Sequence, residues 1–226
     1  MVAARLGGVK KCKPLSNSLR MVMAPPSNVM ADSLYLNLWF ADFGLDNMFA
    51  HALAVIREFP FSPSIPGITY VSLNPVSWNE ATILEQRFRP GATPEEAIAI
   101  AAELAHEDYG YVFEANWDLW TLEPARGEWV LQPTPVRFIV RGEEFEEGES
   151  KIQGEVQVDF GLDTPFLHDE LQLTGELEAR VRANVQMLVD FSSRLEKRSG
   201  ASTRLLWSES DENFAQKLVS RLQRVQ

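Results

Sequence analysis

Hydrophobic and polar positions alternate with a period of two in several stretches of the chain, and this alternation is the pattern of a β-strand. The clearest stretch is LYLNLWFA at residues 34–41, where both alternating sets are largely apolar. Because both faces of such a strand are apolar, we expect it to lie in the middle of a sheet. The same periodicity predicts further strands at residues 67–74, 81–89, 111–120, 135–141, 152–160 and 203–208.

Apolar residues at helical spacing predict four helices, three between these strands and one after the last strand. One short helix follows Gly44, a long helix covers about 177–199, and the last helix of the chain starts near Asp211. The remaining helix, second in chain order, begins at Thr93-Pro94-Glu95-Glu96 and runs to about residue 106. Its start is a strong signal, because Thr suits the N-cap, Pro the first helical position and Glu the third.

The order of the predicted elements up to about residue 120 is β-α-β-β-α-β, which is the order of a ferredoxin-like unit. We therefore predict an α+β fold with antiparallel sheet or sheets and helices packed on one face. Residues 30–130 form the ferredoxin-like unit in this prediction, and residues 131–226 form a diverged, related unit packed on the first. Residues 1–29 are basic and lack periodicity, so they are expected to be a disordered leader or to result from a mis-assigned start.

The relation between the two halves rests on a repeated segment. DFGLDNMFAH at residues 42–51 matches DFGLDTPFLH at residues 159–168, and each copy follows an alternating strand. We interpret the match as an internal duplication that serves the architecture. Gly44 and Gly161 are expected to occupy strand-to-helix turns with positive φ, and Asp46 and Asp163 to cap the following helices. Thr164 competes with Asp163 for the second cap, because Pro165 would then occupy the first helical position.

The charge of the chain is acidic and unevenly distributed. The sequence has 21 basic and 32 acidic residues, and five of the basic residues but none of the acids fall within residues 1–29. Residues 30–226 are therefore strongly acidic and repel phosphate backbones, which disfavours nucleic-acid binding. The single cysteine excludes an intrachain disulfide and agrees with a cytoplasmic location, and no apolar run is long enough for a membrane span.

One short stretch concentrates this negative charge. The segment EEFEEGE holds five acids, and we expect it to be an exposed loop that offers a surface to a basic protein partner. The simpler interpretation is a solvated hairpin loop without a partner. The candidate partner-binding residues are Glu143, Glu144, Glu146, Glu147 and Glu149.

A second candidate site is the aromatic hairpin around WDLWTLEPARGEW. Trp117, Trp120 and Trp129 flank it and would line a cleft for a small ligand, although core packing explains them as well. Glu114 and Asp118 lie on one face of the same strand, where they would serve as a general acid and base. A strand face in contact with water is the simpler explanation of these two acids.

Metal binding and catalysis have weaker support. Asp42, Asp46 and His51, repeated as Asp159, Asp163 and His168, are suitable ligand types, but capping and packing account for the same residues. No phosphate loop, serine elbow or zinc motif occurs, so no cofactor and no metal are predicted. The sequence therefore favours a non-catalytic binding or interaction protein with an acidic surface. A small-ligand-binding protein or an acid–base enzyme is the alternative, and the oligomeric state stays open.

Overall fold

The computed structural model describes residues 32–123, 127–167 and 175–209. These residues build one antiparallel sheet of seven strands in the order β3-β2-β4-β5-β6-β1-β7. The strands are β1 (Ser33–Trp39), β2 (Ile68–Pro75), β3 (Leu84–Arg87), β4 (Tyr109–Glu123), β5 (Glu128–Arg141), β6 (Val156–Leu162) and β7 (Thr203–Ser208). The helices are α1 (Met48–Arg57), α2 (Pro94–Ala102), α3 (Ser150–Gln153) and α4 (Gly175–Arg198), with a short 3-10 helix η1 (Phe145–Gly148).

The α+β prediction is confirmed, but the ferredoxin-like arrangement of the strands is not. A βαβ unit requires two parallel strands, and every strand pair in the described residues is antiparallel. Strand β1 lies between β6 and β7, both from the C-terminal half of the chain. Two apolar faces require a central position for β1, but they do not specify which strands supply its neighbours.

The sheet continues without a break across the predicted boundary at residue 130. The long β4–β5 hairpin straddles that position, and the described residues on both sides of it belong to one compact unit. Residues 1–29, predicted as a leader, lie outside the described residues, as does the helix predicted from Asp211.

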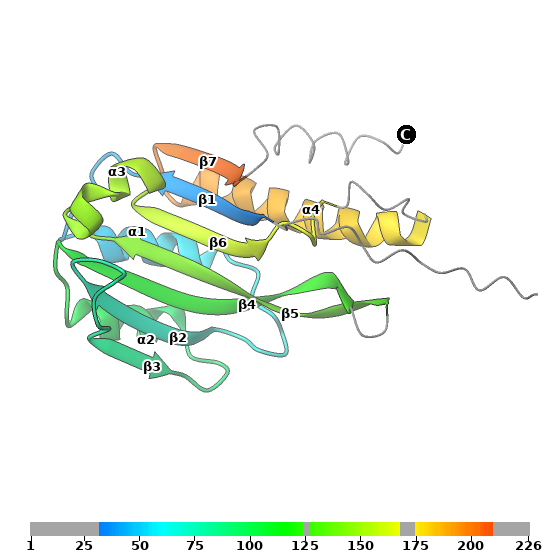
Figure 1. Cartoon of the computed structure of the whole chain (residues 1–226), viewed down its shortest axis with the longest axis horizontal. Helices are drawn as coiled ribbons and strands as arrows, with labels where there is room; N and C mark the ends of the chain where they lie inside the picture. The colour runs from blue at the N-terminus through cyan, green and yellow to red at the C-terminus, as the bar shows by residue number, and fades with distance from the viewer. Residues whose placement is uncertain (1–31, 124–126, 168–174, 210–226) are drawn as a thin grey trace, which may run out of the picture. The chain divides into compact units, whose positions relative to one another are not determined.

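The core lies between one face of the sheet and the helices α1, α2 and α4, which pass behind the sheet in Figure 1. The odd-numbered residues of β4 face these helices, and Tyr111, Phe113 and Trp117 are fully buried. Trp117 stacks on Phe160 with ring centroids 5.2 Å apart. Full burial stabilises each large apolar side chain by roughly 1.5–3 kcal/mol, so this face holds the fold together.

Local signals in the sequence identify two helix ends correctly. Thr93 caps α2 in a complete capping box, because its hydroxyl accepts a bond from the N–H of Glu96 while the Glu96 carboxylate accepts one from the N–H of Thr93. Helix α4 is followed by Ser199 and then by Gly200, whose φ is +77°. Glycine adopts this left-handed conformation without strain, so it ends the helix.

The two copies of DFGLD adopt different local structures. Gly161 has a φ of +73° but lies inside β6, where the next residue, Leu162, pairs with Ser33. Gly44 lies in the turn before α1 without a positive φ, so that part of the prediction is wrong. The N-cap of α1 is Asn47 rather than Asp46, and it makes no side-chain capping bond.

In the second copy, the carbonyl of Asp163 accepts bonds from the N–H groups of Phe166 and Leu167, which forms a turn. The Asp163 side chain accepts a 3.5 Å bond from the Ser208 hydroxyl instead of capping a helix. The duplication is therefore not confirmed by these local structures.

The connection between β5 and β6 is more structured than the predicted hairpin loop. We call residues 142–154 the cap, because they fold over one end of the sheet face that the helices leave uncovered. Phe145 is fully buried there, against Gly110 of β4. The predicted strand at 152–160 starts only at Val156, since Ser150–Gln153 forms α3 within the cap.

Candidate functional site on the uncovered face of the sheet

One row of polar and aromatic side chains crosses all seven strands on the face opposite the three large helices. The strand registers align its members as neighbours, one on each strand. At its centre, Arg137 Nε donates a 3.0 Å bond to Glu114 Oε1. The row consists, in sheet order, of Arg87, Tyr70, Glu114, Arg137, Asp159, Tyr35 and Trp207.

Aromatic contacts order the two ends of this row. The guanidinium carbon of Arg87 lies 5.2 Å from the centre of the Tyr70 ring, and the Tyr35 and Trp207 rings are 5.0 Å apart. Partial burial is the largest of the causes that raise the pKa of Tyr35 above its ordinary value near 10, so its hydroxyl stays protonated at neutral pH. The row is therefore an ordered polar surface.

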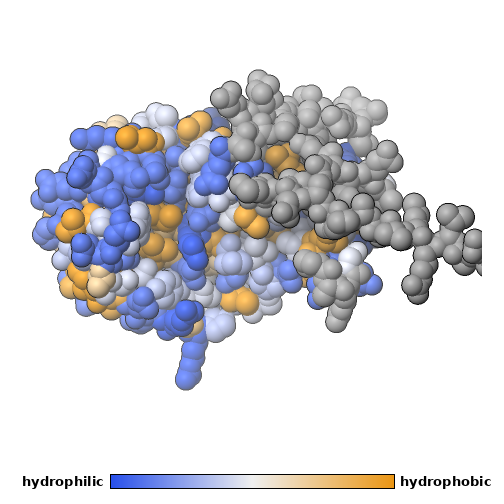
Figure 2. Space-filling view, in the orientation of Figure 1, coloured by the Kyte–Doolittle hydropathy of each residue, from blue (hydrophilic) through white to orange (hydrophobic). Residues whose placement is uncertain are grey.

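A hollow of about 500 Å³ lies beside the central part of this row. The neighbouring cross-strand row supplies Ser72, Val112 and Ile139, which form a small and mainly apolar floor. Trp78, from the loop between β2 and β3, also lines the hollow. Figure 2 looks onto this face and shows small hydrophobic patches among hydrophilic residues. The hollow thus combines an apolar floor with a charged border.

The cap holds Trp78 in place through three contacts. The Trp78 ring packs edge-on against the Phe145 ring, with centroids 4.6 Å apart. Its backbone N–H donates a 2.7 Å bond to Glu146 Oε1, and the Glu146 N–H donates a 2.9 Å bond to the carbonyl of Val76. Because two loops far apart in sequence bond to each other here, Trp78 is fixed by tertiary structure.

The same place concentrates backbone strain. In the described part of the chain, the non-glycine residues with positive φ are Val76 at +60°, Glu146 at +50° and Glu147 at +55°. A β-branched residue such as valine rarely adopts this conformation, and each such residue costs on the order of 1–3 kcal/mol. Strained residues of this kind cluster at functional sites. The end of the hollow where Trp78 lies is therefore a candidate for a functional role.

A buried polar network supports the cap from below. Arg141 is only 2% exposed, and its guanidinium donates a 2.8 Å bond to Gln157 Oε1. Gln157 in turn donates a 2.9 Å bond to Asn37 Oδ1 on β1. Burial lowers the pKa of Arg141 while the nearby Glu149 carboxylate opposes that shift. The network therefore joins β5, β6 and β1 beneath the cap and orients the Arg141 side chain.

The predicted acidic segment divides into two groups. Glu143, Glu144 and Glu147 are exposed, as expected. Glu146 and Glu149 are half-buried, because Glu146 accepts the bond from Trp78 and Glu149 Oε2 lies 3.6 Å from Arg141 Nε. The second pair holds the cap in shape, so only the first three are free to contact a partner.

The three tryptophans of the aromatic hairpin lie in different surroundings. Trp117 is fully buried in the core, where it stacks on Phe160, and Trp129 is 8% exposed. Trp120 is half-buried, with the Arg180 guanidinium carbon 4.6 Å from its ring centre. The tryptophan that lines the hollow is Trp78, which the sequence pattern did not single out.

The two acids predicted as a pair, Glu114 and Asp118, lie in different surroundings. Glu114 lines the hollow and pairs with Arg137, whereas Asp118 lies further along the same face of β4, outside that lining. The second acid at the hollow is Asp159, whose Oδ1 accepts a 2.8 Å bond from the N–H of Gly161.

The residues with ligand types suited to a metal are only partly brought together. His51 Nε2 lies 3.1 Å from Asp42 Oδ1, but no group of three or more metal-ligating side chains suited to a metal ion occurs in residues 32–123, 127–167 and 175–209. His51 stacks on Phe40 with ring centroids 4.2 Å apart, which is a packing role. His168 lies outside the described residues.

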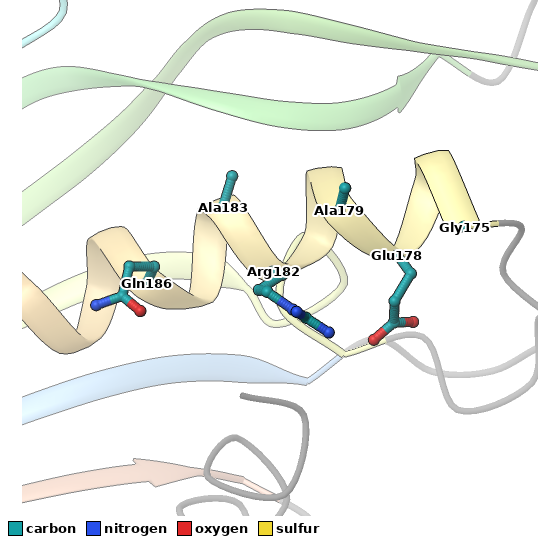
Figure 3. A pocket seen from close by; sticks show the side chains of 6 residues that line it. All are labelled: Gly175, Glu178, Ala179, Arg182, Ala183 and Gln186. Atoms are coloured by element: carbon teal, nitrogen blue, oxygen red, sulfur yellow. The ribbon is translucent and has the colours of Figure 1, made fainter. Parts of the chain in front are cut away.

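A second hollow, of about 510 Å³, lies on α4 (Figure 3). Those of its lining residues that the structure describes belong to that one helix: Gly175, Glu178, Ala179, Arg182, Ala183 and Gln186. Figure 3 shows Ala179 and Ala183 on one side of the helix, with Glu178, Arg182 and Gln186 on another. Because no second element among the described residues adds a side chain to its lining, this hollow is a weaker candidate than the one on the sheet.

The chain matches no protein-family model, no curated protein and no solved structure. None of the helices in the described ranges is both long and apolar enough to cross a membrane. The geometry of the uncovered face is therefore the basis on which a function is inferred.

Proposed function

We propose that the protein is a non-catalytic binding protein that recognises a basic segment of a partner protein on the uncovered face of its sheet. The observation that carries the proposal is the hollow beside the charged row, with its apolar floor and its fixed Trp78 wall. A face of this kind, with an apolar centre and a polar border, has the composition of a protein–protein interface.

The charges near the hollow favour a basic partner. Glu85, Glu114, Asp118 and Asp159 lie on strands of this face, and Glu143, Glu144 and Glu147 lie on the cap. The exposed basic residues of the same region are Arg87, Arg137 and Lys151, and Arg137 is already paired with Glu114. Arg141 lies on the same face but is buried beneath the cap beside Glu149. The acids outnumber the bases, so the field of this face attracts a cationic segment and speeds its association.

The pairing of the charged groups supports a binding role over catalysis. Arg137 is paired with Glu114, and Asp159 accepts a bond from the backbone. A general base must be able to reach and accept a proton from a substrate, and these paired groups act instead as fixed surface charges. Asp42 and His51, which are the types suited to acid–base chemistry, are not among the residues that line the hollow.

The test is binding of a defined basic probe, a lysine-rich dodecapeptide, measured by isothermal titration at several salt concentrations. Replacing Glu143, Glu144 and Glu147 by glutamine should weaken binding by about five- to tenfold and reduce its salt dependence, since exposed pairs contribute roughly 0.2–1 kcal/mol each. The matched control neutralises three exposed acids elsewhere: Glu103, Glu128 and Glu176. If both triple variants lose the same affinity, only net charge matters and the proposed face is wrong.

A further inference from the structure

We infer that the partner segment carries an aromatic side chain between its basic residues, and that this side chain inserts into the hollow against Trp78. This inference rests on the proposed function and specifies the chemistry of the partner.

The floor favours an apolar group. Val112 and Ile139 are neighbours in the register of β4 and β5, and Ser72 continues the same row on β2. These three side chains are small or aliphatic, while the adjacent row carries Tyr70, Glu114 and Arg137. The floor therefore lies lower than the border, and filling it with an apolar group removes hydrocarbon from water.

The wall favours an aromatic group in particular. Trp78 lines the hollow, and its ring is held by the edge-on contact with Phe145 while its backbone N–H is bonded to Glu146. Two aromatic rings that meet gain stability beyond the burial of area, and a wall fixed in advance loses little side-chain entropy on binding. A rigid aromatic wall over an apolar floor is the arrangement that anchors an interface.

The surrounding acids favour positive charges beside the anchor. Glu143, Glu144 and Glu147 are exposed on the cap at the Trp78 end of the face, and Glu114 and Asp159 line the hollow itself. The guanidinium groups of Arg87 and Arg137 are already held, over the Tyr70 ring and by Glu114 respectively. Lysine or arginine residues that flank an aromatic anchor therefore meet carboxylates on either side.

The experiment compares two lysine-rich undecapeptides that differ only at the central residue, phenylalanine or alanine, in titrations with the whole protein. The phenylalanine peptide should bind at least about tenfold more tightly, because its ring packs against the fixed Trp78 wall and alanine cannot. Ile139→Thr and Trp78→Ala should each remove this difference. Leu131→Thr, at an exposed position on the same strand and outside the hollow, should preserve it.

The outcomes separate this inference from the proposed function. Equal binding of the two peptides by the wild-type protein overturns the anchor but leaves the basic partner in place. No binding of either peptide contradicts both proposals. Binding of 3-phenylpropionate in the hollow without binding of either peptide assigns the hollow to small aromatic acids and overturns the inference. Thermal denaturation of each variant shows whether it folds. If Trp78→Ala does not fold, Ile139→Thr still tests the inference.

Discussion

The ring of Phe145 lies so close to Gly110 that a Cβ atom on residue 110 would come within 2.6 Å of it. Phe145 is fully buried and also packs against Trp78, so it has no free space to move into. This contact joins the cap to the sheet and sets the position of the hollow's aromatic wall.

Gly110→Ala should therefore loosen the cap. Overpacking in a filled core typically costs about 1–3 kcal/mol, and a displaced Phe145 also shifts the Trp78 ring. The expected result is a lower melting temperature together with weaker binding of the phenylalanine-containing peptide. Calorimetry and the peptide titration check it, and unchanged values in both would show that the cap is not held by this contact.

The two glycines of the repeated DFGLD segment should respond differently to alanine. Gly161 has positive φ, so Gly161→Ala should lower the free energy of unfolding by about 1 kcal/mol or more. Gly44 lacks positive φ, and a methyl group added there would meet no atom within 4 Å, so Gly44→Ala should be neutral or slightly stabilising. Urea denaturation of both variants measures this, and equal costs would argue that the two turns are alike.

Two arginines on the same face of β5 should differ sharply in their effect on stability. Arg141→Met leaves Gln157 and Glu149 without their buried partner, which should cost roughly 3–5 kcal/mol. Arg137→Met removes a partly exposed pair with Glu114 and should cost about 0–1 kcal/mol. Chemical denaturation compares the two directly, and similar losses would mean that the Arg141 network does not support the cap.

The stability of the fold should depend on the ionisation of Glu155. Burial raises the pKa of Glu155 above its ordinary value near 4.5, and the nearby Glu143 and Asp42 carboxylates act in the same direction, while the bond from the Phe40 N–H opposes them. The folded state therefore binds more protons than the unfolded state in this range. As a result, the contribution of Glu155 to the free energy of unfolding falls as the pH rises from about 4.5.

Glu155→Gln keeps an acceptor for the Phe40 N–H but cannot ionise. The free energy of unfolding of this variant, relative to wild type, should therefore increase between about pH 4 and pH 7. Burial also raises the pKa of Asp163, but that contribution is present in both proteins and cancels in the difference. Urea titrations across this pH range provide the measurement, and a constant difference would contradict the expected linkage.

The sequence predicts the layers of the fold well because the signals are local. Alternation along β4 separates Phe113 and Trp117, which are buried, from Glu114 and Asp118 on the opposite face. The capping residues of α2 act within a single turn, so Thr93 and Glu96 identify that helix start. In contrast, the neighbours of β1 come from residues more than a hundred positions away, and no local pattern specifies them.

The residues of the candidate site were harder to predict, because their positions depend on contacts between segments far apart in the sequence. Arg137 and Arg141 lie on the same face of β5, yet only the second is buried, because the cap covers it. The positive φ of Val76 and the wall formed by Trp78 depend on bonds between two separate loops. One signal was present: Phe145 is a lone apolar residue among five acids, and such a residue indicates a loop that folds back on the core.

The most direct measurement is a titration of the ¹⁵N-labelled protein with the phenylalanine-containing lysine-rich peptide, followed through amide and indole chemical shifts. If the uncovered face is the binding surface, the largest changes fall on Val112, Ile139 and their neighbours on β2, β4 and β5, and on the indole N–H of Trp78. Changes confined to α1, α2 and α4, on the other side of the sheet, would contradict the claim that the uncovered face is the binding surface.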